Sequence, residues 1–383
     1  MAEQGINVNP DLISWAIARS GRSLETLARS LPWIRRWESD KSQPTLKQLE
    51  SLAKKTWTPL GYFFLPKPPE ERLPIPDFRT VRDEPVRRSS PNLIDTLHTM
   101  QRRQWWMREY LVEMGHERLA IVGSAKPTDE VSTVATRIRL ALNMSHGWAG
   151  QVATWTDALR VLREAAEATG ILVVINGVVG NDTHRKLDPE EFRGFVLADE
   201  YAPLVFINGS DARSAQMFTL AHELAHVWIG EAGIFDLPDL QSIGDRREVF
   251  CNRVAAEFLI PSVELRQIWP EARRDPEPFQ VIARQFKVSP IVAARRALDL
   301  GLIDRARFLD FYRAYQADER RKAAKAKGGD FYNNQNVRVG KRFARAVMHA
   351  AKEGRLLYRE AYSLTGLHGA TFERYAKALD ISL

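Results

Sequence analysis

The 383-residue sequence contains a single cysteine and no apolar run that approaches the length of a membrane-spanning helix. One cysteine cannot form an intramolecular disulfide, which is typical of proteins in a reducing cytosol. The first ten residues, MAEQGINVNP, lack the basic-then-apolar pattern of a signal peptide. We therefore expect a soluble, cytoplasmic protein that does not insert into a membrane.

The sequence also lacks a strong excess of either charge. Its 55 Lys and Arg outnumber 48 Asp and Glu, which gives a net charge of +7 and a pI near 9.5. This excess permits binding to nucleic acid or to an acidic partner and identifies neither. Part of it lies in residues 313–327, where we favour a solvated helix end that runs into a linker over a phosphate-binding patch.

The most informative stretch that is present is FTLAHELAH, residues 218–226. Residues four apart on an α-helix lie on one face, so His222 and His226 can direct two imidazole nitrogens at one metal ion. Glu223 stands beside them, where it could accept a proton from water at the metal. The spacing suits zinc. The alternative, two histidines on a solvated helix face, is less favoured.

The residues before this stretch predict how it is presented. Residues 203–208, PLVFIN, are rich in β-branched and aromatic side chains and predict a strand. Gly209, Ser210 and Asp211 are turn residues that end it. We expect Ser210 or Asp211 to cap the helix that carries the histidines.

A catalytic zinc site needs a third protein ligand, and the sequence offers two carboxylates for it. Apolar positions at helical spacing predict a helix that begins near Asp245 and ends before Pro261. Glu248 and Glu257 both lie on this helix. They are nine residues apart, so they are not expected to share a metal, and spacing alone does not choose between them.

HELAH followed by E-x-x-x-N-x-x-A-A-x-x-L-x-P resembles the ImmA/IrrE family of zinc-dependent endopeptidases, which are gluzincin-like. In that family the third ligand lies four residues before the Asn, which here is Glu248 before Asn252. The resemblance implies a Zn²⁺ ion held by His222, His226 and Glu248, with Glu223 as general base. The oxyanion role is left unassigned, although Tyr201, His184 and Tyr332 are available.

The sequence departs from the family in the helix that carries the third ligand. Cys251, Val254 and Phe258 stand where Ala, Phe and Leu are more usual, which changes side-chain size and leaves the ligands intact. Cys251 follows Glu248 by three residues, so its thiol could lie near the metal. A small buried apolar group is favoured over a redox-sensitive thiol.

Residues 10–65 predict short helices that resemble the helix-turn-helix of Cro and lambda repressor. Only ten positions separate Leu27 from Trp37, against about fifteen in that family, so the start of the recognition helix is missing. Asp40 also stands where Gly is usual. We interpret the module as a degenerate remnant used for protein contacts, with DNA binding as the alternative.

A second candidate for a helix-turn-helix lies after the predicted metal site. Residues 279–286 predict a helix, residues 287–289 a turn, and residues 290–300 a second helix with Pro290 near its start. Arg295 and Arg296 would provide positive charge there. A scaffolding role in the peptidase domain is favoured over contact with DNA.

The remaining segments predict an α+β fold. Residues 156–167 predict an amphipathic helix, and residues 171–175 a buried strand. Residues 192–197 and 203–207 would add antiparallel strands, giving a small sheet with helices on one side. With the resemblance, this implies a zincin-like, gluzincin-type domain. Aromatic residues at helical spacing in residues 101–114 indicate a helix that packs in a core.

Four segments are predicted along the chain. Residues 1–70 form the degenerate helix-turn-helix-like, all-α domain, and residues 71–145 a proline-rich arm with a helical connector. Residues 146–325 form the metallopeptidase domain, and residues 326–383 a helical C-terminal segment. The proline-rich residues 66–85 are expected to be extended, as an arm packed on the next domain or as a linker.

The resemblance implies an endopeptidase that cleaves a regulatory protein, with a transcriptional repressor as the expected substrate. The alternative is an antitoxin-like regulator that binds and neutralises a partner toxin, with a zinc site that is structural or conditionally active. A complete HExxH plus Glu favours catalysis, because binding alone would not require Glu223. The expected partner is therefore a protein, a repressor or a toxin, with DNA as an additional candidate.

Overall fold

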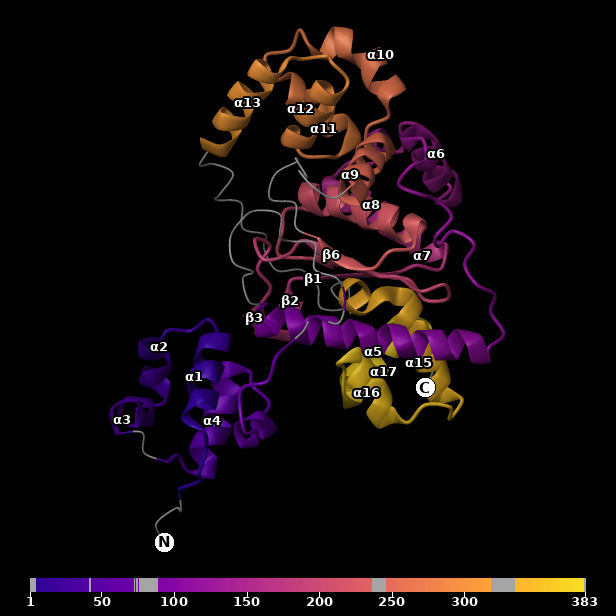
Figure 1. The fold of residues 1–383 in the computed structure, drawn as a ribbon. Helices are drawn as coiled ribbons and strands as arrows, with labels where there is room; N and C mark the ends of the chain where they lie inside the picture. The colour runs from indigo at the N-terminus through magenta and orange to yellow at the C-terminus, as the bar shows by residue number, and fades with distance from the viewer. Residues whose placement is uncertain are drawn as a thin grey trace. The chain divides into compact units, whose positions relative to one another are not determined.

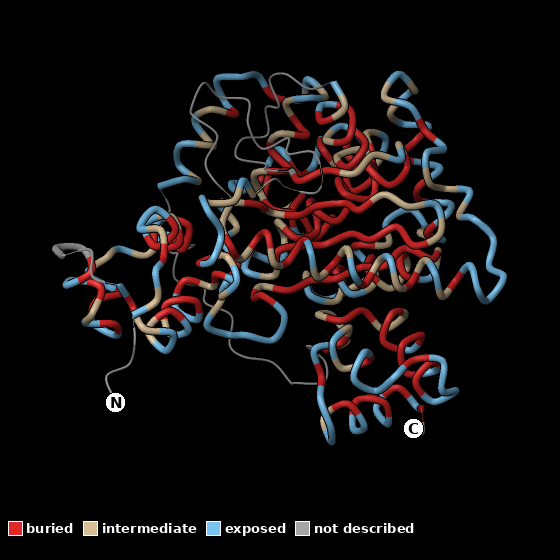
Figure 2. The backbone as a smooth tube through the Cα atoms, turned by 60° about the horizontal axis from the view of Figure 1, so that its bottom comes forward, coloured by how far each residue is buried: buried red, intermediate tan, exposed pale blue. Residues whose placement is uncertain are grey.

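The computed structural model describes residues 5–40, 43–71, 73, 75, 89–235, 246–317 and 335–381. The expected helix start at Asp245, the candidate Tyr332 and most of the proline-rich arm lie outside these residues. The chain divides into two units: Met1–Pro74 with Asp83–His98, and Ile75–Arg82 with Thr99–Leu383. Each unit has its own core, and Figure 2 shows the longest buried stretches in the larger one.

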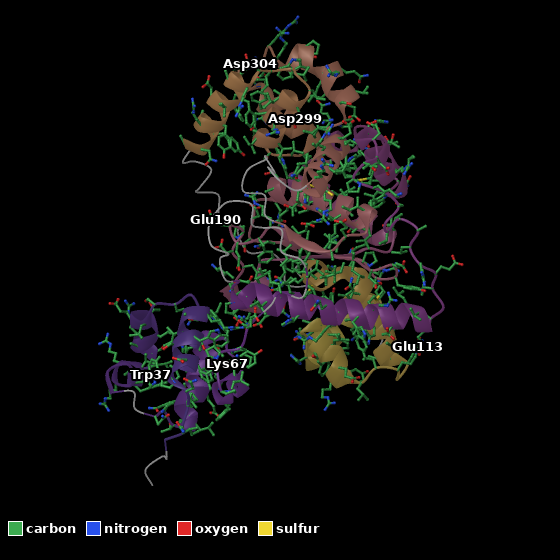
Figure 3. The ribbon with its side chains drawn as sticks, in the orientation of Figure 1. Trp37, Lys67, Glu113, Glu190, Asp299 and Asp304 are labelled. Atoms are coloured by element: carbon green, nitrogen blue, oxygen red, sulfur yellow. The ribbon has the colours of Figure 1, made fainter. Side chains whose placement is uncertain are left out.

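The first unit is built from short helices around one apolar cluster. They are α1 (Pro10–Arg19), α2 (Leu24–Ser30), α3 (Trp33–Asp40), α4 (Leu46–Thr56) and the 3₁₀ helix η1 (Leu60–Phe64). Ser23 caps α2, and Thr45 forms a capping box at α4. Trp37, labelled in Figure 3, is 3% exposed. Only Leu31 and Pro32 separate α2 from α3, which is where the sequence is shorter than the repressor pattern.

The larger unit contains a four-stranded sheet and a separate hairpin, with helices around them (Figure 1). Its strands are β1 (Leu172–Asn176), β2 (Val178–Val179), β3 (Asp182–Lys186), β4 (Gly194–Leu197), β5 (Leu204–Asn208) and β6 (Gly233–Phe235). The helices before and between them are α5 (Pro91–Glu113, whose first turns belong to the first unit), α6 (Val131–Ala141), η2 (Trp148–Gln151), α7 (Trp155–Ala168) and α8 (Arg213–Ile229). The helices that follow are α9 (Arg246–Leu259), α10 (Ser262–Ala272), α11 (Pro278–Phe286), α12 (Pro290–Asp299) and α13 (Arg305–Ala317).

The strand order is β1-β5-β4-β6, and one pairing differs from the prediction. β4 pairs antiparallel with β5, as expected, and also with β6, a strand that the sequence analysis did not predict, but β1 pairs parallel with β5. Parallel strands need a long crossover connection, and here the β2–β3 hairpin and β4 lie between the two strands. The expectation that both later strands run antiparallel was therefore wrong for β1 and β5.

The sheet is also covered on both faces, whereas the sequence predicted helices on one side. Val173, Val205 and Val196 alternate onto the face that joins the core with α7, α8 and α9. The intervening residues of these strands are buried as well. Helix α5 lies on the other side (Figure 1), and its Gln104 donates to the carbonyl of Leu197 at 2.7 Å. Continuous apolar runs in short strands are the signature of such two-sided burial.

The C-terminal residues 335–381 pack against the edge of this sheet. They form the short π-helical turn η4 (Asn336–Gly340), α15 (Lys341–Lys352), α16 (Tyr358–Thr365) and α17 (Gly369–Ala378). Gly340 has a φ of 85°, and a Cβ there would lie 3.4 Å from the carbonyl oxygen of Val173 in β1. Arg103 of α5 donates to the carbonyls of Arg338 and Leu364 at 2.9 Å. None of the helices described is both long and apolar enough to cross a membrane.

Candidate metal centre

Helix α8 carries the HExxH sequence and is buried along most of its length. It begins after Ala212, not after a capping Ser210 or Asp211 as predicted, and no side chain caps it. The Ser210 hydroxyl donates instead to the carbonyl of Gly177 at 3.1 Å. Asp211 lies 3.6 Å from the guanidinium of Arg193. Both side chains that the local sequence predicted as caps therefore make tertiary contacts instead.

The two histidines of α8 face one another across one helical turn. His222 and His226 are 0% and 1% exposed, and their Nε2 atoms lie 3.0 Å apart. The same atoms approach the carboxylate of Glu248 on α9, His222 at 3.3 Å and His226 at 3.1 Å. Helices α8 and α9 pack closely together, which brings these three side chains to one point.

The second carboxylate that the sequence offered lies elsewhere. Glu257 forms an ion pair with Arg296 of α12, and it accepts a bond from the backbone N–H of Ser262 at 3.1 Å. About two and a half turns of α9 separate it from Glu248, which places the two carboxylates on opposite sides of the helix and in different surroundings. Of the two candidates, it is Glu248 that lies beside the histidines.

The geometry of the three donors fits a tetrahedral zinc ion. Zn–N and Zn–O bonds of about 2.0–2.1 Å at tetrahedral angles place neighbouring donor atoms about 3.3 Å apart. The observed separations run from 3.0 to 3.3 Å, and the donor atoms of all three residues lie within 4.8 Å of one another. No fourth His, Cys, Asp or Glu joins this group among the residues described. A metal held here would keep a position open for water or substrate.

Glu223 lies beside this group and is completely buried. Neither of its carboxylate oxygens has a hydrogen-bond partner among the described residues. Burial raises the pKa of Glu223 well above its ordinary value, and the neighbouring charge of Glu248 raises it further. Burial also raises the pKa of Glu248, but hydrogen bonds from His222 and His226 outweigh it and bring that pKa to about 2.

Strand β4 approaches Glu223 through a residue that the sequence analysis did not single out. A Cβ added to Gly194 would lie 2.6 Å from Glu223 Oε1 and 2.9 Å from the carbonyl oxygen of Phe206. Only glycine leaves the space that the carboxylate occupies. A glycine inside a predicted apolar strand is a known signal of close approach, and residues 192–197 contained it.

The other candidate residues have the following places. The Tyr201 hydroxyl lies 3.4 Å from Arg118 Nε, and the ring of Tyr201 lies under the guanidinium of Arg108. His184 is exposed on β3. Cys251 is fully buried in the core beside α8. None of these placements assigns the oxyanion role.

Comparison with known families agrees with this geometry. Residues 166–298, which contain His222, Glu223, His226 and Glu248, match Peptidase_M78, the IrrE N-terminal-like domain. Residues 339–378 match DUF8813, a domain of unknown function. No curated protein matches the chain significantly. The first match supports the resemblance to the ImmA/IrrE family and a metallopeptidase-like function for this part of the chain.

Proposed function

We propose that this protein is a zinc-dependent endopeptidase in which His222, His226 and Glu248 hold the metal and Glu223 is the general base. One observation carries the proposal: among the residues described, the buried carboxylate of Glu223 has no hydrogen-bond partner and stands beside a group of three metal donors with no fourth. A structural zinc site is closed by four protein ligands and has no use for such a carboxylate. A hydrolytic site needs both features.

Each residue of the proposed site has a distinct role in peptide hydrolysis. A bound zinc ion would supply the Lewis acid that polarises the peptide carbonyl and lowers the pKa of water. Glu223 accepts the proton of the attacking water and returns it to the leaving amine. Its dry surroundings strengthen each charge interaction during this transfer. Gly194 fixes how closely β4 can lie to the carboxylate.

The surroundings of the site suit an extended protein substrate. Strand β6 has β4 as its only strand neighbour among the residues described, and Phe235 of β6 is in register with Gly194. A peptide could add to this edge as a further strand. A cavity of about 820 Å³ is lined in part by Phe218 and Asn252, which lie one helical turn from His222 and Glu248 respectively, although none of the four site residues lines it. We infer that it receives a substrate side chain.

The proposed substrate class is a regulatory protein, and the expected example is a transcriptional repressor. The test is affinity capture from the native host with wild type and Glu223→Gln, followed by mass spectrometry and immunoblotting. We expect the variant to hold one protein intact, and wild-type cells to contain fragments of that protein. Glu190→Gln is the matched control, since it makes the same change on an exposed side chain (Figure 3) and should behave as wild type.

The antitoxin-like alternative predicts a different outcome of the same experiment. If wild type and Glu223→Gln capture equal amounts of one intact partner, with no fragments in either strain, binding is the function and cleavage is not. Such a result would reject the peptidase proposal.

A further inference from the structure

The C-terminal segment of residues 335–381 carries most of the net positive charge of the protein. It contains nine Lys and Arg against four Asp and Glu, a net charge of +5 out of +7 for the whole chain. The segment includes the part that matches a domain of unknown function. So uneven a distribution indicates an anionic partner for this segment.

Helix α15 concentrates this charge on one stripe. Its apolar side is buried, with Phe343, Val347 and Met348 at 2% exposure or less. Its exposed residues are Arg345, His349 and Lys352, and no others. They follow one another at intervals of four and three residues, so they line one face of the helix. Every side chain that α15 presents to solvent is therefore a basic type.

Helices α16 and α17 form a tight helical corner after this stripe. Gly366 ends α16 in the left-handed conformation with a φ of 71°, and only Leu367 and His368 follow before α17 begins. Leu367 is buried. The rings of Tyr362 and Phe372 pack edge to face at 5.2 Å and fix the corner. A short glycine-containing turn between two packed helices is the arrangement of a helix-turn-helix.

The second helix of this corner exposes a face that fits a nucleic-acid groove. Gly369 and Ala370 in its first turn are exposed and small, so they allow close approach. Arg374 and Lys377 follow on the exposed side, with no ion pair among the described residues. Arg374 Nε bonds only to the carbonyl of Ala370 in its own helix. Glu373 is the one acidic residue exposed on α17.

The earlier candidate corner, α11 with α12, lacks these properties. Arg296 of α12 is 6% exposed and is bound to Glu257 and to the carbonyl of Ile260. Arg295 pairs with Asp299, which Figure 3 labels at the end of α12. Both arginines of α12 are thus held in ion pairs. Arg374 and Lys377 of α17 form no ion pair among the residues described, which separates the two corners.

We propose that the C-terminal segment binds double-stranded DNA, with α17 entering the major groove and the basic stripe of α15 contacting phosphates. This binding is independent of the peptidase activity. Phe343, Phe372 and Tyr375 are fully buried, and Tyr358, at 44%, is the one Phe, Tyr or Trp of the segment that is exposed, so there is no row of rings on which successive bases of a single strand could stack. The apolar face of α15 is covered, so the helix cannot enter a bilayer through it.

The test uses the full chain and a fluorescein-labelled 30-base-pair duplex of random sequence, with anisotropy measured from 50 to 300 mM salt. Two double variants are compared with wild type: Arg374→Ala with Lys377→Ala, and Arg345→Ala with Lys352→Ala. Each should weaken binding about tenfold or more at 100 mM salt and reduce the slope of log K against log salt by about 2. All four side chains are exposed, so the fold should survive, which circular dichroism checks.

The matched control is Arg305→Ala with Arg307→Ala, which removes two exposed charges from α13. It should retain the wild-type affinity and slope. The proposal is overturned if both C-terminal double variants bind as wild type does, because another part of the chain then binds the duplex. It is equally overturned if wild type binds phosphatidylserine vesicles or single-stranded DNA of the same length more tightly than the duplex.

Discussion

Gly194 of β4 lies so close to Glu223 of α8 that a methyl group on Gly194 would stand 2.6 Å from the carboxylate oxygen. The same methyl group would stand 2.8 Å from Thr219 Cγ2 on the adjacent turn of α8. The strand and the helix therefore share one close contact at the proposed general base. The position of the Glu223 carboxylate is set as much by this strand as by the helix that carries it.

Gly194→Ala should reduce peptidase activity while leaving the metal ligands in place. The added methyl group must displace Glu223 or push β4 away from α8, and either change misplaces the base. We expect a loss of at least about tenfold in kcat/KM, about 1.4 kcal/mol in transition-state stabilisation, with the zinc content unchanged. Gly150→Ala is the control, because its added Cβ meets only an ordinary contact at 3.6 Å. Equal activity in the two variants would refute the role given to Gly194.

Glu248→Gln should lose zinc, and Glu257→Gln should keep it. The outer partners of a metal ligand contribute about 10–100-fold to affinity, and loss of a ligand's charge should cost at least as much. Glu257 is bound to Arg296 and Ser262, away from the histidines, so its substitution should alter stability and not metal content. Zinc per protein after dialysis, measured by mass spectrometry, checks both variants. Retention of zinc in Glu248→Gln would reject the proposed third ligand.

The parts of the fold that local pattern determines could be predicted. The buried strand predicted at residues 171–175 appears one residue later as β1, and helices form around both the histidines and Glu248. The i, i+4 spacing of His222 and His226 is enough to place both on one face of α8. The choice of Glu248 over Glu257 came from family resemblance, since spacing along one helix says nothing about which end meets α8.

The parts that depend on distant contacts could not be predicted. The apolar run of residues 171–175 does not encode the direction of the partner strand, and β1 pairs parallel with a strand 32 positions later. The side chains of Ser210 and Asp211 are of types that often cap helices. In the folded protein the Ser210 hydroxyl donates to the Gly177 carbonyl and Asp211 pairs with Arg193 instead. The hairpin strand β3 is mostly exposed and polar, so it carries no alternating signal. The glycine at position 194 signals that some group approaches the strand closely, but the sequence does not say that this group is the Glu223 carboxylate.

Cys251 should behave as a packed apolar group. Its side chain is 0% exposed in the core shared by α8 and α9. We expect Ellman's reagent to titrate no thiol in the native protein and one thiol in guanidinium chloride. Cys251→Ala should keep wild-type activity and lose a small amount of stability through the cavity it leaves. Rapid labelling of the native protein, or peroxide inactivation that Cys251→Ala abolishes, would instead support a redox-sensitive thiol.

Glu167 at the end of α7 is buried beneath the C-terminal segment, and burial raises its pKa to about 7 despite the nearby charge of Arg163. The charged or titratable groups around it are Arg163, Glu164, Lys341, Arg342 and Tyr375. The backbone N–H of Lys341 donates to it, which links this carboxyl to the start of α15. A carboxyl group that is held protonated in the folded protein makes stability depend on pH.

Glu167→Gln should remove part of that dependence. Because the folded pKa of about 7 exceeds the ordinary 4.5, the folded protein holds the proton that the unfolded chain has lost. The contribution of this proton to the free energy of unfolding is about 3 kcal/mol at most. It is full below about pH 4.5 and disappears as pH rises to 7.

Wild type should thus lose stability from pH 5 to 7.5 in urea unfolding followed by circular dichroism. Glu167→Gln, which resembles the protonated acid, should lose less over the same range. Glu190→Gln, which makes the same change on an exposed side chain that is not among the groups acting on Glu167, is the control and should keep the wild-type slope. Parallel pH profiles for wild type and Glu167→Gln would show that Glu167 is ionised in the folded protein at pH 5.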